Sequence, residues 1–247
     1  KVMTMAAALE EKTVTPTTVF SVPYGLHRAG KTFHDHEKHA TQKLTTTGIL
    51  AVSSNTGSIK VGETLGSEKL YDYLTKFGIG SKTGSGLPGE SAGILRPVKT
   101  WSGTTAPTVA FGQGYSVTAM QATSVFATIA NDGVRVSPTV IAGTSDSSGN
   151  YTPSATRENV RVISAETAAN MRLMMESVVS ANGTAPSAAI PGYRVAGKTG
   201  TAQRIDDTCG CYRGYTASFI GFAPADKPAY VISVTIQDPK GLHWGGY

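Results

Sequence analysis

Apolar residues recur at the spacing of an α-helix in several parts of the chain. Five such segments predict helices: residues 1–11, 42–55, 67–78, 116–133 and 164–183. The first, KVMTMAAALEE, is apolar on nearly every side, so we expect it to be buried. In the last two segments, Thr118 and Ser164 stand where a residue that caps the first turn is expected, and Asn131-Asp132-Gly133 ends the fourth.

Alternating apolar and polar residues mark the last third of the chain. Three runs there predict strands: residues 193–204, 215–224 and 229–239. Their close spacing favours an antiparallel meander. Earlier in the chain, residues 15–35 predict two extended runs around a tight Ala29-Gly30 turn, and the glycine-rich residues 78–90 predict a loop. Helices followed by an antiparallel sheet indicate the α+β class.

Composition and charge narrow the function classes. The chain has 247 residues, of which 40% are hydrophobic and 16% charged, as is typical of a globular protein with a sizeable core. No apolar run approaches the length of a membrane span. The formal net charge is +5, but the basic residues are scattered and are not interleaved with aromatic rings. This distribution argues against nucleic-acid binding and suits an anionic substrate or acidic surroundings.

The stretch GLHRAGKT, residues 25–32, matches the phosphate-loop pattern G-x-x-x-x-G-K-[ST] at every fixed position. A phosphate loop leaves a buried strand and opens a helix. The residues that follow here, FHDHEKHATQ, offer no apolar face over two helical turns. We therefore expect a hairpin at this place and no nucleotide site.

Two other clusters contain reactive residue types. Histidines gather with acids in residues 34–39, HDHEKH, but histidines near acids in a loop are more often solvated, so we expect no metal. Cys209 and Cys211 are separated by one glycine. They are compatible with a tight disulfide on an exported protein and equally with two free thiols, and two thiols are too few for a zinc site.

The strand expected over 193–204 carries four residues that suit an anion site: Lys198, Thr199, Gly200 and Thr201. Alternation puts Lys198 and Gly200 on one face, where the lysine supplies a cation and the glycine lets a substrate backbone approach. The two threonine hydroxyls suit a carboxylate. The Thr201 N–H could point at a developing oxyanion.

A second candidate group lies in the turn AVSSNTG, at the end of the helix expected over 42–55. Ser53 and Asn55 are two residues apart, so both side chains can face a cleft. A serine hydroxyl can relay a proton, and an asparagine amide can bind a substrate carbonyl and a neighbouring ammonium. Taken alone, Ser-Ser-Asn is more typical of an ordinary turn. The turn becomes a candidate site because a Lys-Thr-Gly strand follows later in the chain.

Together these motifs resemble those of class B penicillin-binding proteins. The wider family pattern joins S-x-x-K, S-D-N and K-T-G, and this chain has Ser53–Asn55 followed by Lys198–Gly200. Lys1 heads the apolar stretch VMTMAAALEE and resembles the lysine of S-x-x-K. Three more stretches are similar to family segments: FGIGSKTGSGLPGESAG, AFGQGYSVTAMQATSVFATIANDG and SFIGFAP. The resemblance covers nearly the whole chain, although Ala119 stands where many members carry proline.

The resemblance implies a peptidoglycan D,D-transpeptidase that cross-links stem peptides through a serine acyl-enzyme and is acylated by β-lactams. Lys1 would be the base, Ser53 would relay the proton toward the leaving group, and Asn55 would orient Lys1 and the substrate amide. The residues implied to hold the terminal carboxylate are Lys198, Thr199, Gly200 and Thr201. No metal or cofactor is implied. The implied partners are stem peptides, β-lactams and proteins of cell division or elongation, with no nucleic acid.

The implied fold is an antiparallel sheet flanked by helices, as in penicillin-binding transpeptidases and β-lactamases. Residues 1–247 are expected to be a fragment of one transpeptidase domain, with the early strands and a closing helix missing and the nucleophilic serine three residues before Lys1. The expected location is the outer face of the cytoplasmic membrane, with an anchor in an N-terminal segment outside this chain. The alternatives are a β-lactamase or D,D-carboxypeptidase of the same superfamily, and a non-catalytic penicillin-binding sensor or scaffold.

Overall fold

The computed structural model describes residues 1–154, 159–206 and 208–246. The α-helices are α1 (Val2–Glu10), α2 (Thr46–Ala51), α3 (Asn55–Leu65), α4 (Ser67–Lys76), α5 (Thr105–Ala110), α6 (Ala119–Ala130) and α7 (Ala165–Val179), and the short 3₁₀ helices are η1 (Val98–Thr100) and η2 (Pro186–Ala188). The strands are β1 (Val19–Val22), β2 (Gly25–Arg28), β3 (Lys31–His34), β4 (Gln42–Thr45), β5 (Val134–Val136), β6 (Gly143–Ser145), β7 (Tyr151–Pro153), β8 (Asn159–Arg161), β9 (Ala196–Asp206), β10 (Cys211–Ala223) and β11 (Tyr230–Gln237). None of the described helices combines the length and the apolarity that crossing a bilayer requires.

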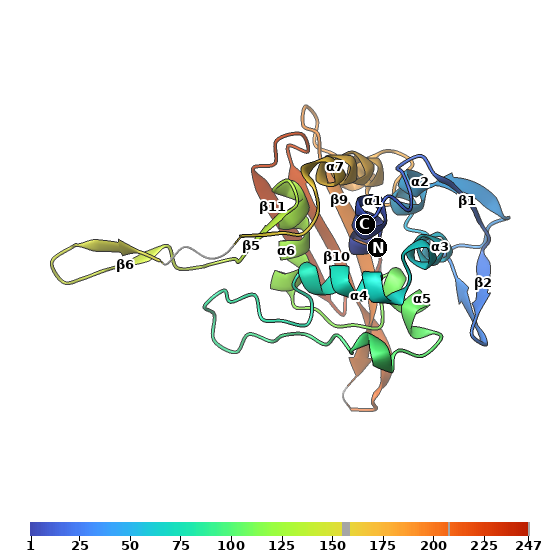
Figure 1. The fold of residues 1–247 in the computed structure, drawn as a ribbon, viewed down its shortest axis with the longest axis horizontal. Helices are drawn as coiled ribbons and strands as arrows, with labels where there is room; N and C mark the ends of the chain where they lie inside the picture. Colours follow the sequence, from blue (N-terminus) through green and yellow to red (C-terminus); the bar gives the residue numbers. More distant parts are fainter. Residues whose placement is uncertain (155–158, 207, 247) are drawn as a thin grey trace.

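The largest sheet has three antiparallel strands in the order β11-β10-β9 (Figure 1). β10 lies in the middle, with Phe222 opposite Ala196 of β9 and Ala223 opposite Tyr230 of β11. The meander and the α+β class predicted from the alternating pattern are thus confirmed. One face of β11 stays exposed through Tyr230, Ile232, Val234 and Ile236.

Helix α1 is buried in the interior of the fold. It contacts α3, α4 and α7, while α7 also packs on β9 and α6 packs on β10 and β11 (Figure 1). The alanines at positions 6, 7 and 8 have no exposed surface, and their small side chains allow the neighbouring helices to approach closely. The expected burial of this segment is confirmed, and Lys1, just before the helix, lies at a partly buried position.

The capped helices begin where their sequences predicted. Thr118 caps α6 in a capping box with Gln121, and the Ser164 side chain accepts the N–H of Thr167 at the start of α7. The helix expected over 67–78 is α4, and residues 78–90 contain no helix or strand. These predictions are confirmed because each rests on a local signal: a cap, apolar residues at helical spacing, or a run of glycines.

The stretch that matches a phosphate loop is a hairpin. β2 and β3 pair with Arg28 opposite Lys31, and the turn residues Ala29 and Gly30 have φ values of 48° and 78°. Positive φ at both turn positions is typical of the two-residue turn that joins strands with a right-handed twist. Thr32 lies in a strand and opens no helix, so the element that binds phosphate in a phosphate loop does not form here.

The helix expected over 42–55 is present only as α2, Thr46–Ala51, and the turn at residues 52–54 separates it from α3. Gln42–Thr45 is the strand β4, which pairs with β1, so that Thr45 lies opposite Val19. The helix begins only at Thr46, because the Thr45 hydroxyl accepts the N–H of Gly48 at 3.0 Å and caps the first turn. Pairing with a distant strand decides the conformation of these residues, and the local sequence does not contain that information.

Helix α3 was not predicted, and neither was α5. The α3 sequence NTGSIKVGETL contains two interior glycines and several β-branched residues, which lower helix propensity. Its neighbours require those glycines. A Cβ on Gly57 would lie 2.8 Å from the Ile49 side chain, and a Cβ on Gly62 would lie 2.7 Å from Cβ of Ala110. The glycines let α3 pack closely on α2 and α5, and this packing stabilises the helix.

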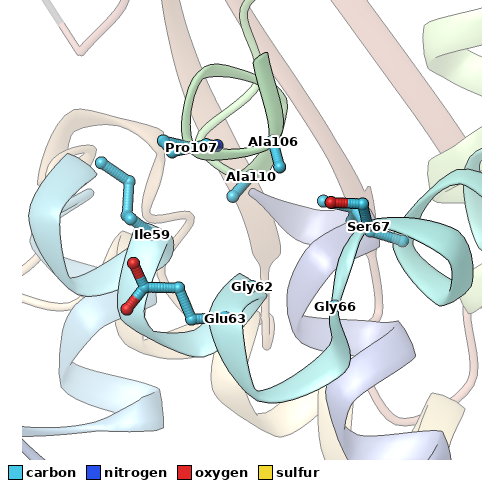
Figure 2. A pocket seen from close by; sticks show the side chains of 9 residues that line it. Ile59, Gly62, Glu63, Gly66, Ser67, Ala106, Pro107 and Ala110 are labelled. Carbon is cyan, nitrogen blue, oxygen red and sulfur yellow. The ribbon is translucent and has the colours of Figure 1, made fainter. Parts of the chain in front are cut away.

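A pocket of about 210 Å³ opens beside the contact between α3 and α5 (Figure 2). Its lining comes from α3, α4 and α5 and consists of Ile59, Gly62, Glu63, Gly66, Ser67, Leu70, Ala106, Pro107 and Ala110. None of the residues that the sequence analysis assigns to a site lines this pocket.

We expect Gly62→Ala to lower the free energy of unfolding by about 1–3 kcal/mol, because the new methyl group overpacks a rigid helix contact. The measurement is chemical denaturation of the full-length protein. The matched control is Gly48→Ala in α2, where a Cβ would meet no atom closer than 3.4 Å. Helix propensity then favours alanine, so the control should be neutral or stabilised by up to about 1 kcal/mol. Equal effects of the two substitutions would contradict the packing argument.

Strands β6 and β7 form an arm that projects away from the rest of the molecule (Figure 1). The turn at its end is organised by Asp146, whose carboxylate accepts the N–H groups of Ser148 and Asn150, each at 2.9 Å. The arm is far from the elements that carry the expected site residues. Asp146 can therefore serve as a control for Asp35, a carboxylate that also accepts backbone N–H groups.

Candidate active site

The Ser53–Asn55 turn joins α2 to α3. Ser53 has φ = 59°, a left-handed conformation that is uncommon for a residue with a side chain. Ser54 caps α3, since its hydroxyl accepts the N–H of Gly57 at 2.9 Å, and Asn55 is the first helical residue. The turn therefore presents Ser53 from a sharply bent backbone between two helices.

Lys198 brings this turn together with the sheet. Its side chain extends from β9, and the residue is only 6% exposed. The ammonium Nζ donates to Oγ of Ser53 at 2.8 Å and to the carbonyl oxygen and hydroxyl of Thr199, both at 3.2 Å. Two motifs 145 residues apart in the sequence thus meet at one hydrogen bond.

Lys1 is the third group of the site. It precedes α1, and its Nζ lies 6.0 Å from the centre of the Phe111 ring. A Cβ on Gly112 would lie 3.5 Å from the Lys1 backbone nitrogen, so the glycine-rich segment after α5 runs directly beside this residue. Burial lowers the pKa of Lys1 to about 8, against a smaller opposing effect of the Asp35 charge. The neutral amine is therefore the minor form at pH 7 and becomes the major form above about pH 8.

The pKa of Lys198 is lowered as well. Burial, and then repulsion from Lys1, hold the pKa of Lys198 well below its usual range. Two amines close together in a dry site oppose each other's protonation. A carboxylate that entered the site would relieve this repulsion and favour the charged form of the amine that it contacts.

The rest of the expected anion site is occupied by the protein's own hydrogen bonds. The hydroxyls of Thr199 and Thr184 lie 2.8 Å apart, and the Thr201 hydroxyl accepts the N–H of Gly245 at 3.1 Å. A Cβ on Gly200 would come within 2.5 Å of Ser218 Oγ, so that hydroxyl fills the room the glycine leaves. The structure thus brings Thr199, Gly200 and Thr201 together with Lys198 on one short length of β9.

No sequence pattern indicated Asp35, whose side chain binds the Ser53–Asn55 turn through hydrogen bonds. Asp35 follows β3, and its Oδ1 accepts the backbone N–H groups of Asn55 at 2.6 Å and Thr56 at 2.9 Å. Its Oδ2 accepts the Ser54 hydroxyl at 2.6 Å. The signal available in the sequence was an aspartate in a histidine-rich loop, which drew attention only as a metal site.

The segment that follows β11 carries two aromatic rings, His243 and Trp244, which contact β10 and the loop after β3. The His243 ring stacks on Tyr215 with centroids 4.4 Å apart, and Trp244 contacts His36 with centroids 3.8 Å apart. Gly245, which bonds to Thr201, comes next. These contacts join the loop after β3 to the chain beyond β11.

Neither the cysteines nor the histidines form a metal centre in the part of the chain that the structure describes. Cys209 and Cys211 are joined in a disulfide at the tip of the β9–β10 hairpin, which decides between the two states left open by the sequence. Within residues 1–154, 159–206 and 208–246, no three His, Cys, Asp or Glu side chains are grouped as metal ligands. His36 and His39 are engaged by Trp244 and Asp35.

Comparisons with known proteins find relatives over the whole chain. The family model of the penicillin binding protein transpeptidase domain matches residues 1–247. The chain is 44% identical over 248 residues to penicillin-binding protein PbpB of Mycolicibacterium smegmatis, which covers 97% of this chain and 38% of that protein. It is 34% identical over 255 residues to the peptidoglycan D,D-transpeptidase FtsI of Escherichia coli, covering 100% of this chain and 40% of that protein.

A solved structure shows the same fold. Penicillin binding protein 3 of Mycobacterium tuberculosis, complexed with aztreonam, superposes with a TM-score of 0.94 at 42% identity and covers 96% of this chain and 55% of that one. The same protein complexed with ampicillin gives a TM-score of 0.93, with 97% of this chain covered. The chain thus spans less than half the length of the two curated relatives, 38% and 40%.

Proposed function

This chain belongs to the penicillin-binding protein transpeptidase family, and from that premise we propose that it carries out D,D-transpeptidation of peptidoglycan stem peptides and is acylated by β-lactams. We further propose that residues 1–247 are a fragment of one transpeptidase domain, since the family model matches all of them. The observation that carries the proposal is the 2.8 Å hydrogen bond from Lys198 to Ser53, close to Lys1, whose charge acts on Lys198. It brings the Ser-x-Asn turn, the Lys-Thr-Gly strand and a lysine of lowered pKa to one place.

The proposed reaction begins with a serine three residues before Lys1. Its hydroxyl oxygen attacks the carbonyl carbon of the penultimate D-alanine, while Lys1 Nζ accepts the hydroxyl proton. The resulting tetrahedral oxyanion is held by the backbone N–H of Thr201 and that of the serine itself. The C–N bond then breaks, the leaving amine takes up a proton, and free D-alanine departs from the acyl-enzyme.

Ser53 and Asn55 support the proton transfers in this proposal. Ser53 Oγ accepts a hydrogen bond from Lys198, which leaves its own O–H free to donate toward the leaving amine. The proton can therefore pass from Lys1 through Ser53 to the departing nitrogen. Asn55 donates one amide hydrogen to the carbonyl oxygen of His34 at 3.0 Å, which sets the orientation of the amide group beside Lys1 and the substrate.

Substrate binding falls to β9. We assign the terminal carboxylate of the stem peptide to Lys198 with the hydroxyls of Thr199 and Thr201. Both hydroxyls already make hydrogen bonds within the protein, to Thr184 and from Gly245, so the carboxylate would exchange with or add to these contacts. Pairing with the carboxylate raises the pKa of Lys198 again, since an opposite charge offsets the cost of burial. The Lys198 cation then opposes protonation of Lys1 and keeps its amine neutral, the form that can accept the serine proton.

An amine from a neighbouring stem peptide completes the proposed cycle. It attacks the ester carbonyl, the ester C–O bond breaks, and the serine oxygen recovers a proton by way of Lys1. The product is a new amide cross-link. Acting on peptidoglycan requires the site to be outside the cytoplasm, so we place it at the outer face of the cytoplasmic membrane. We also propose proteins of cell division or elongation as partners, as the resemblance to class B penicillin-binding proteins implies.

The test is an incubation of the full-length protein with a penicillin, followed by intact mass and mapping of the modified peptide. We expect a long-lived adduct of one penicillin on the serine three residues before Lys1. Rapid turnover of the penicillin would favour a β-lactamase, and release of D-alanine without cross-linking would favour a D,D-carboxypeptidase. Absence of any adduct on the full-length protein would contradict the proposal and favour a binding or sensor role.

A further inference from the structure

Asp35 is the most heavily engaged carboxylate near the site. Its side chain is 8% exposed, and its two oxygens accept hydrogen bonds from the Asn55 and Thr56 N–H groups and from the Ser54 hydroxyl. These three residues directly follow Ser53. Because the first N–H groups of a helix have no partner within the helix, a buried carboxylate that accepts them holds the helix start in place.

His39 is a fourth partner of Asp35. Its Nε2 lies 3.1 Å from Oδ2 of Asp35, and its Nδ1 lies 2.8 Å from the carbonyl oxygen of Ala40. A carboxylate and a carbonyl oxygen can only accept, so both ring nitrogens must donate. The geometry therefore suits the doubly protonated imidazolium, and a neutral ring would lose one of the two hydrogen bonds.

We propose that Asp35 and His39 form a protonation-dependent clamp that holds the Ser53–Asn55 turn against Lys198, with Asp35 as a positioning residue for acyl transfer. This inference rests on the proposed function, since the turn matters only if Ser53 and Asn55 take part in the reaction. The clamp consists of Asp35 with Ser54, Asn55, Thr56 and His39. Its purpose follows from the backbone at Ser53: a left-handed residue between two helices stays in that conformation only when its neighbours hold it.

The charges around the clamp set the direction of its pH dependence. His39 faces the Tyr24 ring, edge-on at 6.0 Å, and Asp35, and Asp35 in turn acts on Lys1. The hydrogen bond to Ala40, followed by the contact with Asp35, raises the pKa of His39 above its usual value. The charged form is therefore complete at low pH. As the pH rises through this raised pKa, the clamp loses the charge of the His39 contact but keeps the hydrogen bonds from Ser54, Asn55 and Thr56 to Asp35.

The clamp also acts on Lys1 through charge. Asp35 opposes the lowering of the Lys1 pKa by burial. While His39 is protonated, its positive charge partly offsets the Asp35 carboxylate. Removing the carboxylate charge should lower the pKa of Lys1 further, so the rise of the acylation rate with pH should begin at lower pH. Replacing a residue with a purely structural role would not change the pH at which the acylation rate begins to rise.

Asp35→Asn removes the charge of the side chain and keeps its shape. The amide oxygen still accepts the N–H groups of Asn55 and Thr56. The amide nitrogen can donate to Nε2 of a neutral His39, whose Nδ1 still donates to Ala40. We expect the second-order acylation rate constant to fall by about 3- to 10-fold, as for the loss of one charge-assisted hydrogen bond, and the rising limb to move to lower pH.

Asp35→Ala removes the whole carboxylate and leaves the helix start without its acceptor. We expect acylation to fall by about 10²-fold, the effect of misplacing a reacting group by about an ångström. The control is Asp146→Asn on the projecting arm, since Asp146 also accepts two backbone N–H groups. This control should leave the rate and its pH profile unchanged.

The experiment measures acylation by a fluorescent penicillin between pH 5 and 10 in the full-length protein and its three variants, with the melting temperature of each. A rate loss in Asp35→Ala, together with an acid shift of the limb in Asp35→Asn, supports the clamp. Wild-type rates in both variants, or a uniform loss without a shift in Asp35→Asn, would overturn it. A wild-type protein that is never acylated overturns the proposed function itself, and with it any role of the clamp in acyl transfer.

Discussion

Replacing Lys1 with methionine is expected to lower the rate of acylation by penicillin by about 10²- to 10⁴-fold, the range found when a general base is removed. Methionine fills a similar volume and suits the buried position, so the substitution removes the amine with little change in packing. Stopped-flow or gel-based acylation of the full-length protein gives the rate. The melting temperature should stay within a few degrees of the wild-type value.

The pH dependence of the wild-type protein tests the same assignment. With a Lys1 pKa of about 8, the neutral amine that accepts the serine proton is the minor form at pH 7 and the major form above pH 8. Acylation should therefore rise with pH and level off above about pH 8. Lys1→Met should remove this rise. The control is Lys12→Met, at an exposed position just after α1, which should behave as the wild type. A Lys1→Met protein with the normal rate and profile would exclude Lys1 as the base.

The second expected result concerns the buried lysine of the sheet. Lys198→Ala should lower acylation by about 10²- to 10³-fold, as the loss of a preorganised electrostatic contact in an active site does. The substitution removes the cation assigned to the carboxylate and the hydrogen bond to Ser53 at 2.8 Å. Saturation kinetics should show weaker binding of penicillin as well as slower acylation, because the carboxylate is present in the ground state and in the transition state.

The chain contains its own control for Lys198. The same tripeptide, Lys-Thr-Gly, occurs at Lys82–Gly84, in a loop where Lys82 is exposed. Lys82→Ala should leave acylation unchanged. Loss of activity in both variants would point to a general effect of lysine removal, and a normal rate in Lys198→Ala would contradict the assignment of the carboxylate site.

The parts of the fold that could be predicted are those encoded by local pattern. The buried helix that follows Lys1 and the antiparallel meander were both apparent from apolar periodicity, because each element must bury one surface. Helix α3 was not apparent, since Gly57 and Gly62 lower helix propensity. These glycines stabilise the fold only through the close contacts with α2 and α5 that they allow. Helix propensity does not take account of such contacts between elements.

The same division applies to the site. Ser53, Asn55 and Lys198 could be proposed from the sequence because they belong to motifs whose residue types suit the chemistry. Asp35 belongs to no such motif, and its importance comes from a hairpin that returns the chain to the start of α3. The match of residues 25–32 to a phosphate loop shows the converse, since a pattern without its structural context indicated a function that the fold does not support.

The left-handed backbone at Ser53 also limits how this site can evolve. Threonine would keep the hydroxyl, but a β-branched residue is strongly disfavoured at φ = 59°. Glycine and asparagine accept that backbone and lack the hydroxyl. Among the common residues, serine is the one that meets both demands. A population exposed to an inhibitor of this site would therefore find little variation available at position 53, and heritable changes in sensitivity should accumulate instead at the residues that hold the turn.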